Sequence, residues 1–120
     1  MSGRADDNRS EIRVVELGDG IAAIELIGDH GFHDARKIRA ALSTAARGYA
    51  CVVLDLSPAT FIDSSVIREI VVASRSAKHE RRRFYVQAPA GRPITRRLRL
   101  MHLDRLMPVC HSRVEALAAP

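Results

Sequence analysis

The 120-residue sequence contains no tryptophan, and aromatic side chains make up 4% of it. Its core must therefore be aliphatic, and a hydrophobic fraction of 47% is ample for one. No apolar run approaches the roughly 20 residues of a transmembrane helix, and the polar first ten residues hold no apolar segment for secretion. We therefore expect one cytoplasmic domain, because the length suits a single core.

Cysteine is also scarce, since Cys51 and Cys110 are the only two. Both lie in apolar segments, and neither belongs to a pattern typical of a metal site. Buried free thiols are the main interpretation, and a redox-sensitive pair is the alternative. His30 and His33 have no further ligand nearby in the sequence, so we expect neither a metal nor a cofactor.

Positive charge is in excess, with a formal net charge of +5. Much of it is local, at residues 81–83 and at Arg96, Arg97 and Arg99. Few aromatic side chains accompany these arginines for base stacking. Solvated helix faces are the first interpretation, an acidic protein partner the second, and direct nucleic-acid binding the least favoured.

Hydrophobic periodicity predicts alternating strands and helices after a flexible leader at residues 1–10. Two β-branched runs around Gly18-Asp19-Gly20 are typical of a hairpin, and a turn cluster follows at Gly28 to Gly31. Strands are predicted at 12–17, 21–27, 50–56, 84–88 and 107–110, a short buried stretch at 61–62, and helices at 35–47, from 65, from 94 and from 113. The fold class is α/β, a mixed sheet of about five strands with about four helices in β-β-α-β-α-β-α-β-α order.

The most informative segment is Asp63-Ser64-Ser65, between a buried stretch and an amphipathic helix. One such residue suffices to cap the helix, which is the simplest interpretation. Two serines beside an acid leave a spare hydroxyl at a helix N-terminus, where a phosphate dianion is accommodated. The segment therefore predicts a docking and switching site.

An enzyme that uses Ser64 as a nucleophile is the rival interpretation. The Gly-x-Ser-x-Gly motif is absent, and no histidine has a spacing that pairs it with Ser64. The sequence also lacks a phosphate-binding loop. We therefore expect no catalytic residues and a protein that is not an enzyme.

The segment Val52-Val53-Leu54-Asp55-Leu56-Ser57-x-x-Thr60-Phe61-Ile62-Asp63-Ser64-Ser65 resembles the STAS domain family, which includes the bacterial anti-sigma factor antagonists. The resemblance extends from about Val14 to Ala118 and gives a STAS domain at 11–120. It implies that the chain binds an anti-sigma factor with serine kinase activity and so releases a sigma factor for transcription. It also implies that phosphorylation of Ser64 ends this binding, and that a phosphatase restores it.

By the same resemblance, the partner-binding residues are Asp29, Asp63, Ser64, Ser65, Val66, Ile67 and Arg68. Two positions depart from the family pattern: Val66 replaces a glycine, and Gly31 replaces an acid in the first helix loop. The bulk of Val66 motivates an alternative, an unphosphorylated scaffold subunit of a signalling or lipid-transport assembly. The oligomeric state is left open between a monomer and a weak dimer.

Overall fold

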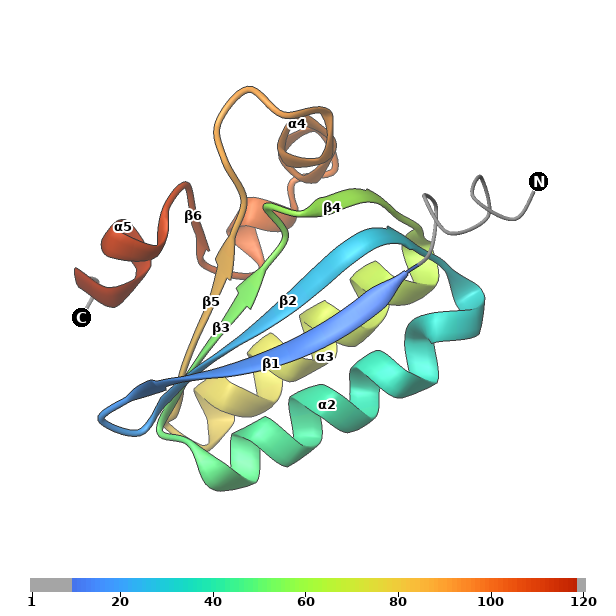
Figure 1. Ribbon diagram of the computed structural model, residues 1–120. Helices are drawn as coiled ribbons and strands as arrows, with labels where there is room; N and C mark the ends of the chain where they lie inside the picture. The colour runs from blue at the N-terminus through green and yellow to red at the C-terminus, as the bar shows by residue number, and fades with distance from the viewer. Residues whose placement is uncertain (1–9, 119–120) are drawn as a thin grey trace.

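The structure is a computed structural model that describes residues 10–118 (Figure 1). The strands in this range are β1 (Glu11–Gly18), β2 (Ile21–His30), β3 (Cys51–Asp55), β4 (Ala59–Ile62), β5 (Arg83–Gln87) and β6 (Val109–Cys110). The α-helices are α2 (Ala35–Gly48), α3 (Ser64–His79), α4 (Pro93–Leu100) and α5 (Arg113–Ala118), and the 3-10 helices are η1 (Phe32–Asp34) and η2 (Leu103–Arg105). The predicted α/β order is confirmed, with β4 as a sixth strand.

The strands form one mixed sheet in the order β1-β2-β3-β5-β6, and β4 pairs with β2 beside this path. The β1–β2 pair is antiparallel, as the predicted hairpin requires, and all other pairs are parallel. Gly18, Asp19 and Gly20 all have positive φ, which explains why small or turn-forming residues occupy this hairpin. Parallel pairing brings the carboxyl ends of β2, β3 and β5 to one edge of the sheet, where the loops gather.

Helices cover both faces of the sheet, with α2 and α3 side by side on one face and α5 on the other (Figure 1). The strand predicted at 50–56 is confirmed as β3, and all its residues are buried, as is typical of a central strand covered on both faces. Val52 and Leu54 of β3 point into the larger core beneath α2 and α3, whereas Cys51 and Val53 point into a smaller cluster that includes Ala116 of α5. The two faces of β3 therefore pack against different helical layers.

The two cysteines confirm the interpretation as buried free thiols. Neither forms a disulfide, and both belong to the smaller cluster. Burial raises the pKa of the Cys51 thiol and the pKa of the Cys110 thiol above the usual value, so both favour the neutral form.

The path of β2 differs from the prediction of a turn at Gly28 to Gly31. The strand pairs with β3 as far as Glu25, continues beyond Gly28, and pairs with β4 through Asp29 and His30. Gly28 has a φ of 84°, a backbone conformation that an L side chain rarely adopts, and its N–H donates to the carbonyl of Pro58 (3.0 Å). Glycine therefore redirects the strand here and does not end it.

The pairing with β4 also corrects the prediction of a buried stretch at 61–62. Ile62 is buried, but the Phe61 side chain is 47% exposed. The pairing passes from Gly28–Ala59 to Asp29–Phe61, so Thr60 is an extra residue in β4 and breaks the alternation of side chains: Thr60 and Phe61 are both exposed. The predicted leader at residues 1–10 lies outside the described residues, except for Ser10.

The terminal helix α5 is attached to the sheet edge by Arg113. Ser112 caps the helix, which the sequence predicts from 113, by accepting a hydrogen bond from the Glu115 N–H (3.1 Å). Arg113 then donates to the buried Asp55 carboxylate of β3 (2.8 Å) and to the Gln87 amide oxygen of β5 (3.2 Å). The same carboxylate accepts from the backbone N–H of Ser57 (2.8 Å), so it also orders the segment that leads into β4.

We expect Arg113→Ala to lower the free energy of unfolding by about 1–3 kcal/mol, because it leaves the buried Asp55 carboxylate without its charged partner. Urea denaturation of both proteins measures the loss. Arg36→Ala is the matched control, since Arg36 is exposed and makes no ion pair within residues 10–118. Equal stabilities for wild type and Arg113→Ala contradict the assigned role.

Candidate functional site

The carboxylate of Asp63 organises the start of α3. Asp63 is the N-cap residue, and its Oδ1 accepts hydrogen bonds from the backbone N–H groups of Ser65 (3.0 Å) and Val66 (3.1 Å). These are two of the donors that a helix leaves unsatisfied in its first turn. The Ser65 hydroxyl donates to the same oxygen (2.5 Å). Of the three residues that the sequence offers as caps, Asp63 performs the capping.

The same carboxylate joins α3 to the loop after β2. The Asp63 N–H donates to the His30 carbonyl (3.2 Å), and the Phe32 N–H donates to the Asp63 carboxylate. Gly31 makes this approach possible, because a Cβ at this position would lie 3.2 Å from the Asp63 Oδ2. The Ser65 hydroxyl and the backbone donors lower the pKa of Asp63 below its usual value, so the carboxyl stays ionised.

Ser64 and Ser65 have different environments although they are neighbours. The Ser65 side chain is partly buried, and its hydroxyl is engaged by Asp63. Ser64 is the first residue of α3, is exposed, and makes no hydrogen bond through its hydroxyl within residues 10–118. The spare hydroxyl that the sequence predicts is therefore on Ser64.

Val66 and Ile67 do not lie on the surface that the sequence prediction gave them. The Val66 side chain is fully buried and the Ile67 side chain is 5% exposed, and both belong to the larger core. The third and fourth residues of α3 face the sheet because the helix packs on it through this stripe. This part of the docking prediction is wrong, and Val66 does not narrow the approach of a partner.

Two aromatic rings near the site in sequence are exposed. The sequence analysis did not predict that they lie on the surface. Phe32 is 75% exposed in η1, next to the N–H that binds Asp63, and Phe61 is 47% exposed two residues before Asp63. The Arg97 guanidinium of α4 lies 5.3 Å from the centroid of the Phe61 ring and donates to the Ile62 carbonyl (2.6 Å). The one sequence signal for Phe32 was an apolar ring inside a polar turn cluster.

Asp29 and Arg68 complete the exposed part of the site. Asp29 pairs with Phe61 in the β2–β4 ladder and accepts a hydrogen bond from the Thr60 hydroxyl. Arg68 lies on α3 one turn after Ser64, so the two share one face of the helix. We call the exposed residues Asp29, Phe32, Phe61, Ser64 and Arg68 the switch surface.

Replacement of Asp63 tests its capping role. We expect Asp63→Ala to lower the free energy of unfolding by about 1 kcal/mol, the usual cost of losing a cap. Asp63→Asn keeps a capping oxygen but removes the charge, so it isolates the effect of ionisation. Chemical denaturation across a pH series measures both variants.

The pH dependence follows from the lowered pKa of Asp63. A carboxyl with a lowered folded-state pKa stabilises the fold above its unfolded pKa, and this contribution disappears as the pH falls through the folded value. The stability advantage of wild type over Asp63→Asn must therefore be largest at neutral pH and shrink in acid, below the ordinary value of 3.8. Asp104→Asn is the control, since Asp104 is exposed without an ion pair within residues 10–118. An advantage that does not change with pH contradicts the assignment.

Comparison with known proteins places this geometry in a family. The family model described as the STAS domain matches residues 13–116. The chain therefore belongs to the STAS domain family. A search of curated protein sequences found no match.

Solved structures share the fold at low sequence identity. An anti-sigma factor antagonist from Mycobacterium paratuberculosis is 22% identical, with a TM-score of 0.75 over 92% of each chain. The anti-sigma factor antagonist SpoIIAA in its unphosphorylated form is 19% identical, with a TM-score of 0.69 over 89% of this chain and 94% of that chain. A sulfate transporter family protein from Wolinella succinogenes is 18% identical, with a TM-score of 0.65 over 88% of this chain and 87% of that chain.

Two further features concern the residues that the structure describes. Among residues 10–118, no three His, Cys, Asp or Glu side chains are grouped so as to hold a metal ion. None of the helices in this range has the length and apolar character needed to span a membrane.

Proposed function

We propose that this chain is a cytoplasmic anti-sigma factor antagonist, a binding module without catalytic activity. In this proposal the switch surface binds an anti-sigma factor that is a serine kinase, and this binding frees a sigma factor for transcription. The kinase phosphorylates Ser64, the complex dissociates, and a phosphatase restores the antagonist. The observation that carries the proposal is the exposed hydroxyl of Ser64, which makes no hydrogen bond within residues 10–118, beside an Asp63 carboxylate that is engaged in capping.

The position of Ser64 supports it as the phosphoacceptor in preference to Ser65. A kinase needs a hydroxyl that reaches its own active site, and the Ser65 hydroxyl is already bonded to Asp63. A phosphate on the first residue of α3 meets the positive end of the helix dipole, so the modified state does not oppose the fold. Phosphorylation therefore alters the surface and leaves the helix in place.

The switch surface supports partner binding and its reversal. Phe32 and Phe61 present aromatic rings of the kind that anchor protein interfaces. A phosphate on Ser64 adds a charge of about −1.5 to −2 to a surface that already carries Asp29. Burying that dianion against a partner has a large desolvation cost, so the modified protein must bind more weakly.

Phosphorylation by the cognate anti-sigma kinase tests the proposal directly. With ATP, wild type and Ser65→Ala are expected to be labelled, whereas Ser64→Ala is expected to remain unlabelled. Ser64→Glu should bind the unmodified partner more weakly than wild type, because the added charge is desolvated at the interface. Mass spectrometry locates the phosphate, and calorimetry measures the affinity. Labelling that persists in Ser64→Ala contradicts the assignment of Ser64.

The aromatic rings offer a second test that does not depend on phosphorylation. Phe32→Ala and Phe61→Ala are each expected to weaken the binding of the anti-sigma factor by at least about 1 kcal/mol, if the rings are interface anchors. Val114→Ala is the matched control, since Val114 is 80% exposed on α5, away from the switch surface. An unchanged affinity in both aromatic variants, with the fold intact by circular dichroism, removes these rings from the interface.

An unphosphorylated scaffold subunit is the second candidate. The fold likeness to a sulfate transporter family protein favours it, because STAS-like folds also occur in that setting. The bulk of Val66 no longer supports it, since this side chain is buried. Affinity capture with wild type and with Ser64→Glu separates the candidates: a kinase lost from the second bait supports the antagonist, and transport components retained on both support the scaffold.

A further inference from the structure

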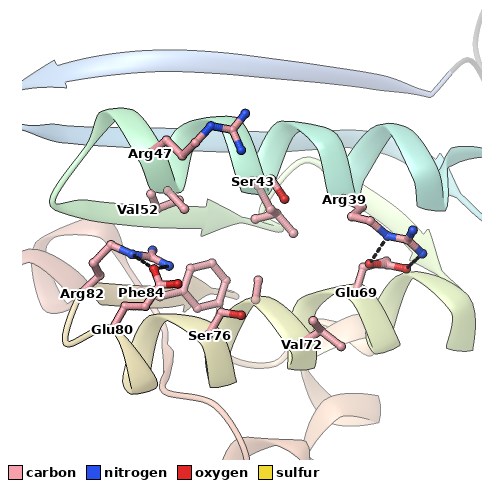
Figure 2. A pocket seen from close by; sticks show the side chains of 13 residues that line it. Arg39, Ser43, Arg47, Val52, Glu69, Val72, Ser76, Glu80, Arg82 and Phe84 are labelled. Atoms are coloured by element: carbon pink, nitrogen blue, oxygen red, sulfur yellow. Dashed lines mark hydrogen bonds and ion pairs between the residues drawn. The ribbon is translucent and has the colours of Figure 1, made fainter.

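A cavity of about 360 Å³ lies between α2 and α3, on the helical face of the sheet (Figure 2). We call it the α2–α3 cavity. Its floor is apolar and comes from four elements: Leu42, Ala46, Val52, Val72 and Phe84. This volume lies within the range of small-molecule sites, which are concave and mostly apolar with a few polar groups at fixed positions.

The space exists because small side chains face each other across the two helices. The lining includes Ser43 and Ala46 of α2 and Ala73 and Ser76 of α3. Figure 2 shows Ser43 and Ser76 on the two helices that border the cavity. Side chains of this size do not fill the distance between two helices that rest on the same sheet. Leu42, Val52 and Phe84 of the floor are buried, whereas the Val72 side chain is 52% exposed, so the floor is only partly open to solvent.

Two ion pairs lie at the ends of the cavity and are satisfied without a ligand (Figure 2). At one end Arg39 of α2 binds the mostly buried Glu69 of α3 through two hydrogen bonds (3.0 and 2.8 Å). At the other end Arg82 donates to Glu80 (2.8 Å). The carboxylates of both pairs are therefore neutralised by their own arginines.

Arg47 is different, since it lines the cavity and makes no ion pair or hydrogen bond through its side chain within residues 10–118. The hydroxyls of Ser43 and Ser76 also make no hydrogen bond within this range, and Figure 2 shows them on the two opposite helices. The cavity therefore offers one spare cation and two spare hydroxyls above an apolar floor. Its chemical complement is a molecule with one anionic group and an apolar body.

The distance between the ends limits the length of that body. The lining residues of α2 run from Arg39 to Arg47, which corresponds to about 12 Å at the helical rise per residue. A chain of medium length fits between the two ion pairs, whereas a long lipid tail extends beyond them.

We propose that the α2–α3 cavity binds a small anionic amphiphile. The headgroup, a carboxylate or a phosphate monoester, binds Arg47, and a medium-length alkyl chain covers the apolar floor. No residue of the switch surface lines this cavity, although Arg68 of that surface directly precedes Glu69 at its near end. The inference therefore does not depend on the proposed function.

Calorimetric titration of the whole protein with decanoate, decyl phosphate and decanol, each below its aggregation threshold, tests the proposal. Saturable binding of one stoichiometric equivalent is expected for an anion with a chain, and binding at least about tenfold weaker for the uncharged alcohol, because a charge-assisted hydrogen bond is lost. Decanoate and decyl phosphate distinguish the two headgroups. Inorganic phosphate carries the headgroup without an alkyl chain. If it binds as tightly as decyl phosphate, the apolar floor does not contribute to binding and this part of the proposal is overturned.

Matched variants assign the binding to this cavity. Arg47→Ala is expected to weaken binding of the preferred anion at least about tenfold, whereas Arg36→Ala, with the same change of charge on an exposed position of α2, leaves it unchanged. Ser43→Trp fills the cavity and is expected to abolish binding, whereas Thr44→Trp, an exposed neighbour that does not line it, has no effect. Absence of saturable binding in wild type, or full binding in both Arg47→Ala and Ser43→Trp, overturns the proposal.

Discussion

The carboxylate of Asp63 is the interaction on which the site depends. It closes the first turn of α3, holds the Ser65 hydroxyl, and accepts the N–H of Phe32 from the loop after β2. One side chain thus fixes the start of the helix and the position of that loop. Because the Ser65 hydroxyl is bonded to Asp63, the hydroxyl beside the cap that makes no hydrogen bond within residues 10–118 is that of Ser64.

The sheet itself brings β2 and β4 together at the site, independently of the hydrogen bonds of Asp63. β2 turns at Gly28 and continues alongside β4, so that Asp29 and Phe61 become neighbours. The β4 segment is also fixed from the side of α4, where Arg92 donates to the carbonyls of Ser57 (2.7 Å) and Ala59 (3.0 Å). Arg97, one of the clustered arginines in the sequence, also donates to a backbone carbonyl, that of Ile62 (2.6 Å), so part of that positive charge has a structural role.

Local signals in the sequence were enough for the element order, for the strand predicted at 50–56 and found at Cys51–Asp55, and for the helix predicted from 65, which begins at Ser64 after the Asp63 cap. These features depend on periodicity, capping chemistry and turn residues within a short window. The pairing of β4 with β2 could not be predicted in this way, because it joins Asp29 to a residue 32 positions later through the backbone. The exposure of Phe61 depends on that pairing, since the pairing decides which face of a four-residue strand meets the core.

Val66 shows that a functional argument has the same limit, because the sequence alone does not tell which way a side chain faces. A valine in place of a family glycine suggests an obstacle to a partner only if its side chain faces the partner. Asp63 is the N-cap, so Val66 is the third residue of α3, and its side chain points to the sheet beneath the helix. The extra methyl groups therefore add to the core and leave Ser64 accessible. The departure from the family pattern thus concerns the packing of the helix, and the exposed surface keeps Ser64 accessible beside the bonded Asp63 carboxylate.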